Sequence, residues 1–354
     1  MESPVKATAS RPEATRPDSN HPKVLTGWLS ALMGLSQQPA PVVLALLLVV
    51  VAVVRPAFFG GANITAILQQ AAILGLVTIG QTFVLLGRGL DLSVGAVMGL
   101  SAAIVTKFVG NGTAFGLAIL VAFGVSAAVG VLNAWLVVRR SVAPFIATLG
   151  TYILVEGLRT AYTQGSTTGV APRALRHVAL GSLGAVPTAL LIWAAVTVVS
   201  LGVLHRTALG RLLYASGGNP QAARLSGVPV ATVLAASYVV AALLACCAGL
   251  LQAGYTGYVD QYLGNQVQLT SITAALIGGV TFAGGKGGML GPVAGALLLT
   301  VLANLVALLN LSSADQSIVT GAVLLLAVAL QGLRLALQSG RVALRDLLPP
   351  LREG

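Results

Sequence analysis

Charged residues are scarce in this sequence. Lys, Arg, Asp and Glu make up only 8% of its 354 residues, whereas 56% are hydrophobic and the mean hydropathy is +0.91. A soluble domain carries about 25% charged residues, and a soluble chain with so little charge would expose large apolar patches and aggregate. The shortage therefore excludes a soluble enzyme and a disordered chain. It favours a protein that crosses a membrane several times.

Cysteine is scarce too. The only two cysteines, Cys246 and Cys247, are adjacent within an apolar run. Neighbouring cysteines are poorly placed for a disulfide, and two cysteines cannot supply a four-ligand metal site. We therefore expect both to be small packing residues, and we expect neither a disulfide scaffold nor a metal site.

Long stretches without charge indicate the fold class. Residues 24–54, 56–87, 108–138 and 225–259 contain no Asp, Glu, Lys or Arg, and a spanning helix needs roughly 20 apolar residues. An outer-membrane barrel would instead show alternating strands of about ten residues. The sequence therefore predicts an all-α, polytopic membrane protein of about ten helices. The predicted spans are 41–59, 64–87, 91–109, 113–138, 141–163, 183–204, 230–252, 267–284, 289–310 and 315–333.

The ends of the chain are polar. Residues 1–40 are expected to form a disordered cytoplasmic tail, without a cleavable signal peptide, because strong apolarity begins only near Pro41. The transmembrane domain is expected at 41–335, followed by a cytoplasmic tail at 336–354.

The distribution of positive charge predicts the orientation. Ten spans place both termini on one side, together with 15 of the 20 Lys and Arg residues. Cytoplasmic loops are enriched in Lys and Arg, so both termini are expected in the cytoplasm. The net charge of +11 thus reflects topology. Nucleic acid is not an expected partner, because no dense basic cluster with interleaved aromatics is present. The other five Lys and Arg residues are expected on the opposite side of the membrane: Arg55, Lys107, Arg159, Arg173 and Arg176.

Segment 205–229 is a polar loop between two strong spans. Asn219 can cap a short helix that ends at Leu225, and Gly227 can stop it. A short helix on the cytoplasmic face suits docking into a groove of another protein, although an ordinary interfacial connector fits the composition equally well. The docking candidates are Asn219, Gln221, Ala222, Ala223, Arg224 and Gly227.

Two acids lie within or beside the spans. Asp91 could cap the helix expected from Leu92, pair with Arg88 or line a pathway, and capping is favoured. Glu156 lies three residues before Arg159, so a local ion pair is favoured over a proton relay.

Uncharged polar residues inside the spans are candidates for a translocation pathway. Their amides and hydroxyls can exchange hydrogen bonds with a polyol that sheds its water, but they can also join helices to one another. Without dense carboxylates or paired histidines, a metal or redox channel is not expected. With Asp91 included, the candidates are Gln69, Gln70, Gln81, Thr82, Asp91, Asn133, Thr148, Tyr152, Gln268, Thr270, Ser271 and Asn304.

The glycine-rich stretch 278–296 is not a phosphate-binding loop. A Walker A motif needs Gly, four residues, then Gly-Lys-Ser/Thr, but Val280 stands at the first glycine position and Gly287 follows Lys286. Any ATP hydrolysis must therefore come from another chain. Residues 285–290 also resemble 87–92, at an offset of 198 residues, as expected for two related halves of a transporter.

Four blocks resemble the permease subunits of bacterial ABC importers for monosaccharides, of the ribose/xylose/galactose type. The resemblance covers about residues 40–335. The blocks are GRGLDLSVGAVMGL (87–100), VAPFIATLGTYILVEGLRTAYTQG (142–165), GRLLYASGGNPQAARLSGV (210–228) and ITAALIGGVTFAGGKGGMLGPVAGALL (272–298).

This resemblance implies a type II ABC importer-like permease in the bacterial inner membrane, in contact with lipid. It would pair with a second copy or a sister permease. Its other partners would be a cytoplasmic ATPase, often a fused tandem, that binds ATP and Mg, and a periplasmic or lipid-anchored sugar-binding protein. The permease itself would hold no cofactor and no catalytic residue, and the sugar would move inward by alternating access.

The family's docking loop has the pattern Glu-Ala-Ala followed four residues later by Gly. Here Gln221 replaces the Glu, while Ala222, Ala223 and Gly227 match the pattern. The resemblance leaves permeases for nucleosides, branched-chain amino acids or a furanosyl autoinducer open. A proton-coupled secondary transporter that works alone is the alternative from another class.

Overall fold

The computed structural model describes residues 39–310 and 312–338, which belong to one compact unit. Most of the two predicted tails, 1–40 and 336–354, lies outside the described residues. The helices are α2 (Pro39–Val54), η1 (Pro56–Phe59), α3 (Gly61–Leu86), α4 (Val94–Gly110), α5 (Phe115–Ala134), η2 (Trp135–Arg139), α6 (Pro144–Thr163), α7 (Arg173–Leu180), α8 (Thr188–Arg206), α9 (Ala208–Gly218), α10 (Pro220–Leu225), α11 (Val230–Thr256), α12 (Val267–Ile277), α13 (Leu290–Leu308) and α14 (Ser313–Gln338). The strands are β1 (Thr168–Val170), β2 (Ser182–Leu183), β3 (Val186–Pro187) and β4 (Tyr258–Val259).

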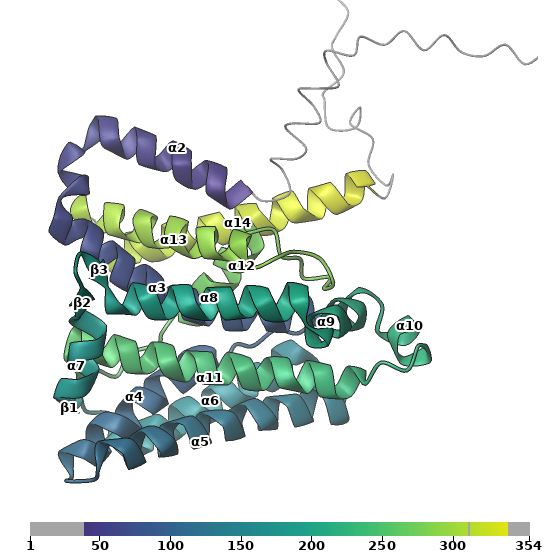
Figure 1. The fold of residues 1–354 in the computed structure, drawn as a ribbon, viewed down its shortest axis with the longest axis horizontal. Coiled ribbons are helices and arrows are strands. Elements are labelled where there is room, and N and C mark those ends of the chain that lie inside the picture. Colours follow the sequence, from purple (N-terminus) through teal and green to yellow (C-terminus); the bar gives the residue numbers. More distant parts are fainter. Residues whose placement is uncertain (1–38, 311, 339–354) are drawn as a thin grey trace, which may run out of the picture. The chain divides into compact units, whose positions relative to one another are not determined.

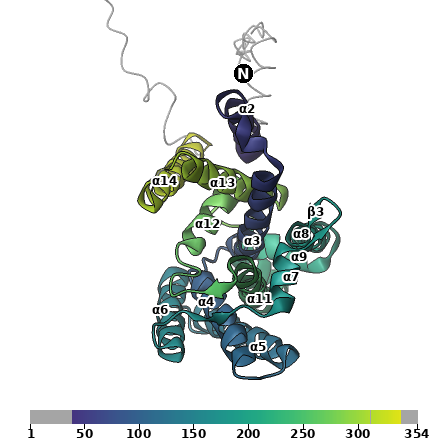
Figure 2. The same cartoon turned by 90° about the vertical axis from the view of Figure 1, so that its left-hand side faces the viewer.

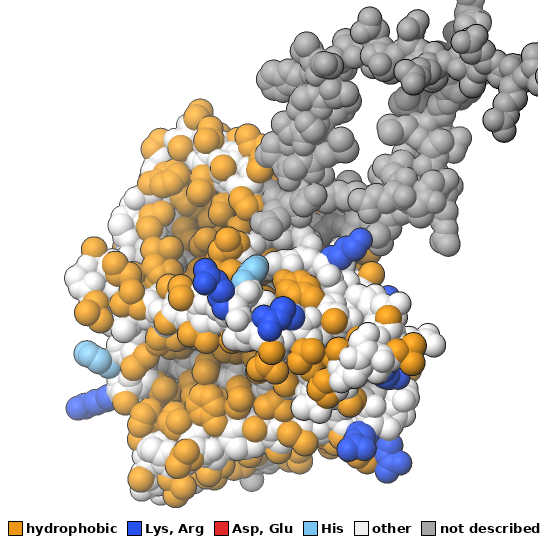
Figure 3. All heavy atoms as spheres, turned by 45° about the vertical axis from the view of Figure 1, so that its right-hand side comes forward, with side chains coloured by type: hydrophobic (Ala, Val, Ile, Leu, Met, Phe, Trp, Pro, Cys, Tyr) orange, Lys and Arg blue, Asp and Glu red, His pale blue; other side chains and the backbone are white. Residues whose placement is uncertain are grey.

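The outward surface of the helices is apolar. Within residues 39–310 and 312–338, five helices are long and apolar enough to cross a membrane: α3, α5 together with η2, α8, α11 and α13. Large side chains such as Val53 (78% exposed), Leu120 (69%) and Val198 (67%) point away from the core, and hydrophobic atoms cover much of the surface in Figure 3. Such a surface suits lipid rather than water.

Helix α11 lies in the middle of the bundle, against α3, α4, α5 and α7 (Figures 1 and 2). Small residues make these crossings close. A Cβ atom added at Gly80 of α3 would lie 2.9 Å from Ala241 Cα, and one at Gly249 of α11 would lie 2.2 Å from the Met98 carbonyl oxygen. Glycine therefore allows the backbones of α3 and α4 to approach α11 directly, as in other membrane bundles. Cys246 is fully buried in this core, as a free thiol.

The bundle has two distinct ends. Helix α7 and the short strands lie at one end, and α9 and α10 lie at the other (Figure 1). Strand β1 pairs antiparallel with β4, and β2 pairs with β3 in a small hairpin. This hairpin occupies the start of the span predicted at 183–204, so α8 begins only at Thr188.

Helix α12 is shorter than predicted. The expected span at 267–284 ends at Ile277, and residues 278–289 form an irregular glycine-rich turn. Gly279, Gly284, Gly285 and Gly287 all have positive φ there, a conformation that glycine adopts easily and a helix excludes. Hydropathy alone therefore placed the end of this span too late in the sequence.

Candidate functional site: a polar cleft and a docking helix

A cleft of about 360 Å³ lies among α3, α4, α11, α12, α13 and α14. Its lining residues, all within the described part of the chain, include no Asp, Glu, Lys or Arg. Six lining residues are apolar: Ile73, Leu74, Met98, Val267, Leu299 and Ala303. Nine are polar and uncharged: Gln70, Gln252, Tyr255, Asn265, Gln266, Thr270, Thr300, Gln316 and Thr320.

Two hydrogen bonds join polar groups of the cleft to other helices. Gln70 Nε2 donates to the Tyr255 hydroxyl oxygen at 3.1 Å, between α3 and α11. Ser317 Oγ of α14 donates to Gln266 Oε1 at 3.2 Å. Amides and hydroxyls both donate and accept, so the cleft can bind a neutral solute with several hydroxyl groups.

Two residues of the predicted pathway, Gln70 and Thr270, line this cleft. Several others form contacts between helices. Gln69 Nε2 donates to the Ala179 carbonyl oxygen at 3.3 Å, while the amides of Asn63 and Asn304 exchange hydrogen bonds between α3 and α13 at 2.9 and 3.1 Å. These bonds hold helices together, and a role in translocation stays a prediction.

Other predicted pathway residues bond within their own helix or pack in the core. The hydroxyl groups of Thr82, Thr148 and Ser271 donate to carbonyl oxygens three or four residues earlier. Tyr152 packs against the hydrophobic core, and Gln268 Oε1 is buried close to Gly95 of α4.

Seven polar residues of the cleft were not among the predicted candidates. A signal was available, because three pairs lie at helical spacing: Gln252 with Tyr255, Gln266 with Thr270 and Gln316 with Thr320. Residues three or four apart share a helix face. The unpredicted lining residues are Gln252, Tyr255, Asn265, Gln266, Thr300, Gln316 and Thr320.

Asp91 lies in a buried polar cluster at the break between α3 and α4. Its Oδ1 accepts hydrogen bonds from Ser93 N (2.8 Å) and Ser93 Oγ (2.6 Å), and Asn133 Nδ2 of α5 donates to Ser93 Oγ at 2.8 Å. The Gln81 side-chain amide bonds to the backbone N and O of Asp91, both at 3.2 Å. The cluster thus joins three of the predicted residues, Gln81, Asp91 and Asn133.

The expected contacts of Asp91 need correction. Arg88 does not pair with it, because Arg88 Nε donates to the Ala283 carbonyl oxygen at 2.6 Å. Helix α4 starts at Val94 rather than Leu92, and its N-cap residue is Ser93. Asp91 therefore orders the turn before the helix instead of capping its first residues.

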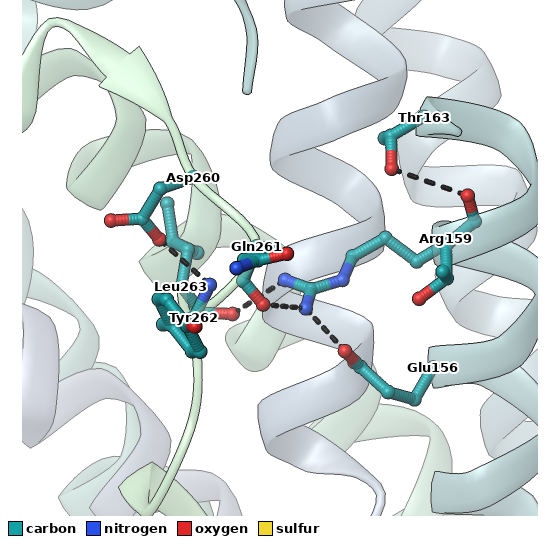
Figure 4. A network of polar contacts seen from close by, with 8 residues as sticks. Glu156, Arg159, Thr163, Asp260, Gln261, Tyr262 and Leu263 are labelled. Atoms are coloured by element: carbon teal, nitrogen blue, oxygen red, sulfur yellow. Dashed lines mark hydrogen bonds and ion pairs between the residues drawn. The ribbon is translucent and has the colours of Figure 1, made fainter. Parts of the chain in front are cut away.

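The predicted ion pair between Glu156 and Arg159 is confirmed (Figure 4). Arg159 also reaches outside its own helix. Its Nη1 donates to the Leu263 carbonyl oxygen at 2.9 Å, and its Nη2 donates to the carbonyl oxygen of Gln261. Both acceptors lie in the segment between β4 and α12.

Segment 205–229 contains the predicted short helix, α10. Asn219 Oδ1 accepts from Gln221 N (3.1 Å) and Ala222 N (3.0 Å), so the predicted N-cap is confirmed. Gly227, with φ +79°, follows the end of the helix. Arg224 is exposed and Leu225 is 86% exposed, which gives α10 a free apolar and basic surface.

The two similar turns of the chain, 87–92 and 285–290, lie against each other. Gly285 N donates to the Leu86 carbonyl oxygen at 2.9 Å, and a Cβ atom added at Gly284 would lie 2.2 Å from Arg88 Cγ. The glycine-rich turn is thus packed on the end of α3, near the start of α10.

The sequence is similar to known transport permeases over most of its length. The family model described as branched-chain amino acid transport system / permease component matches residues 63–328. The chain is 36% identical to the ribose import permease RbsC of Escherichia coli K12 over 83% of this chain and 93% of the relative. Identity is 34% to the fructose import permease FrcC of Rhizobium meliloti (88% and 89% covered) and 31% to the galactose/methyl galactoside import permease MglC of Escherichia coli K12 (83% and 94%). No solved structure matches.

Proposed function

The chain belongs to this family of transport-system permease components, and on that premise we propose that it is the membrane subunit of an ATP-driven importer for a monosaccharide. The observation that carries the proposal is the cleft, in which nine uncharged polar residues and no charged residue among those described face one space. A pentose or hexose is neutral and carries several hydroxyl groups, so it matches both properties. The sugar import permeases related to the chain over most of its length support the same substrate class.

In this proposal, α10 docks into a separate cytoplasmic ATPase, which binds ATP and Mg. Its exposed Arg224 and Leu225 would supply the contact, and Asn219 would fix the start of the helix. A second permease copy or a sister permease would complete the membrane unit, and a sugar-binding protein would deliver the solute at the end that carries α7. Both termini would then lie in the cytoplasm.

The test is reconstitution of the whole importer, with its ATPase and binding protein, in proteoliposomes. We expect ATP-dependent uptake of a labelled monosaccharide, with D-ribose, D-xylose, D-fructose and D-galactose as probes. Arg224→Glu should lower uptake and binding-protein-stimulated ATP hydrolysis together, because an acid replaces the exposed base of the docking helix. Arg139→Glu, an exposed charge reversal in η2 outside the docking helix, is the control. Uptake of none of the four sugars by the intact complex would refute the substrate class.

The same system separates ATP-driven import from proton-coupled transport. Glu156 is already paired with Arg159, so Glu156→Gln should leave uptake independent of an imposed proton gradient. Uptake that follows the gradient without ATP, and that Glu156→Gln abolishes, would instead support a secondary transporter.

A further inference from the structure

We propose that Arg159 is a positioning residue for the sugar path: its guanidinium fixes segment 260–266, and this segment places Asn265 and Gln266 in the cleft. The role of Arg159 in sugar transport rests on the proposed function, whereas its hold on the segment does not. Arg159 itself does not line the cleft, so it would act through the backbone that it holds.

The guanidinium makes three polar contacts from a buried position. The Arg159 side chain is only 3% exposed. It donates to the carbonyl oxygens of Gln261 and Leu263 and pairs with the Glu156 carboxylate (Figure 4). Since buried backbone oxygens need donors, one side chain of α6 satisfies two acceptors of a non-helical segment about 100 residues away in sequence.

Helix α4 provides the space for this contact through two glycines one turn apart. A Cβ atom at Gly99 would lie 2.4 Å from Arg159 Nη1 and 2.7 Å from the Leu263 carbonyl oxygen. A Cβ atom at Gly95 would lie 2.5 Å from the Gly264 carbonyl oxygen. The guanidinium and the segment therefore occupy the space beside Gly95 and Gly99. A larger side chain at either position would fill this space and push them away from α4.

The segment turns sharply directly after the held carbonyls. Gly264 has φ +94° and Gln266 has φ +65°, after which α12 begins at Val267. This turn carries Asn265 and Gln266 into the cleft lining. Because only two residues separate Leu263 from Gln266, a shift of the Leu263 carbonyl moves the Gln266 amide with it.

Arginine suits this task better than lysine. Its planar fork presents several N–H donors in fixed directions, whereas a lysine ammonium is a single charged point on a flexible stem. A lysine at this position could reach one acceptor at a time. Arg159→Lys should therefore retain the charge and lose the simultaneous hold on both carbonyls.

The experiment uses the reconstituted complex with D-ribose as the first probe, and measures sugar moved per ATP hydrolysed. Arg159→Gln and Gln266→Ala should each lower this ratio about five- to tenfold, and Arg159→Lys about as much as Arg159→Gln. The double variant should fall no lower than the worse single variant, since coupled residues are non-additive. Arg139→Gln, an exposed arginine of η2, should leave the ratio unchanged. An unchanged ratio in Arg159→Gln, or a double variant in which the two losses multiply, would overturn the proposal.

A labelling measurement tests the position of the segment even when a variant transports poorly. Leu263 is 8% exposed, so in the purified full complex, with Cys246 and Cys247 replaced by alanine, Leu263→Cys should react slowly with a maleimide. Adding Arg159→Gln should raise the rate at least several-fold, and adding Arg139→Gln should not. Equal labelling rates with and without the Arg159→Gln substitution would refute the proposal. If the intact complex moves none of the four sugars, the proposed function fails, but the labelling result still decides whether Arg159 holds the segment.

Discussion

Tyr214 of α9 donates its phenolic hydrogen to the carbonyl oxygen of Gly287 at 2.8 Å. Partial burial raises the pKa of Tyr214 above its usual value, so the hydroxyl stays protonated and can donate at neutral pH. Helix α9 leads directly into α10, and Gly287 lies in the turn between α12 and α13. Helices α12 and α13 both line the cleft. The bond thus joins the docking segment to the cleft through one short turn.

Removal of this hydroxyl should weaken the link between docking and transport. Tyr214→Phe keeps the ring and deletes one hydrogen bond, which contributes about 0.5–1.5 kcal/mol. We expect a several-fold lower rate of ATP-driven sugar uptake in proteoliposomes at an unchanged amount of permease. Tyr258→Phe, in a half-exposed tyrosine of β4, is the control. Equal loss in both variants would show that the bond to Gly287 has no special role.

Adjacent glycines at the end of α9 should respond differently to the same substitution. A Cβ atom at Gly217 would lie 1.8 Å from the Leu86 carbonyl oxygen and 2.8 Å from Gly285 N, whereas one at Gly218 has nothing within 4 Å. Gly217→Ala should therefore push the glycine-rich turn and the end of α3 apart, at a cost of about 1–3 kcal/mol or more. Melting temperatures in detergent should fall for Gly217→Ala and hold for Gly218→Ala. Similar melting temperatures for the two variants would contradict this packing.

The docking helix could be predicted from sequence because its determinants are local. Asn219 caps α10 by bonding to the two amides that lie two and three residues ahead, and Gly227 follows the helix with positive φ. Such signals act within a few residues. The ion pair of Glu156 and Arg159 was predictable for the same reason.

The cleft could not be predicted in the same way, because it depends on long-range packing. Its lining comes from six helices and the segment before α12, and polarity alone does not distinguish a residue that faces this space from one that joins two helices. Asn304 illustrates the second case, since it bonds to Asn63. The end of the span before the glycine-rich turn was predicted at 284 instead of Ile277, because average hydropathy does not register positive φ values.

The cap of α10 gives a third prediction. Asn219→Ala removes the acceptor for Gln221 N and Ala222 N, and loss of such a cap costs about 1 kcal/mol. A helix of six residues has little else to hold its first turn, so stimulation of ATP hydrolysis by the sugar-loaded binding protein should drop. Asn219→Ser, which supplies another good capping oxygen, should keep most of it. The idea fails if serine and alanine behave alike.

The buried cluster around Asp91 gives the last prediction. Asn133→Leu removes the amide that donates to Ser93 Oγ at 2.8 Å and lies 3.4 Å from Asp91 Oδ1. The Asp91 carboxylate would then be held by Ser93 alone, because the Gln81 amide bonds to the Asp91 backbone. Loss of a partner from a buried polar group costs about 1–3 kcal/mol. Ser126→Ala is the matched control, because Ser126 is also buried on α5 but donates to Ala122 of its own helix. The melting temperature of the purified complex should fall clearly for Asn133→Leu and little for Ser126→Ala. A fall of the same size in both would mean that the cluster does not stabilise the break between α3 and α4.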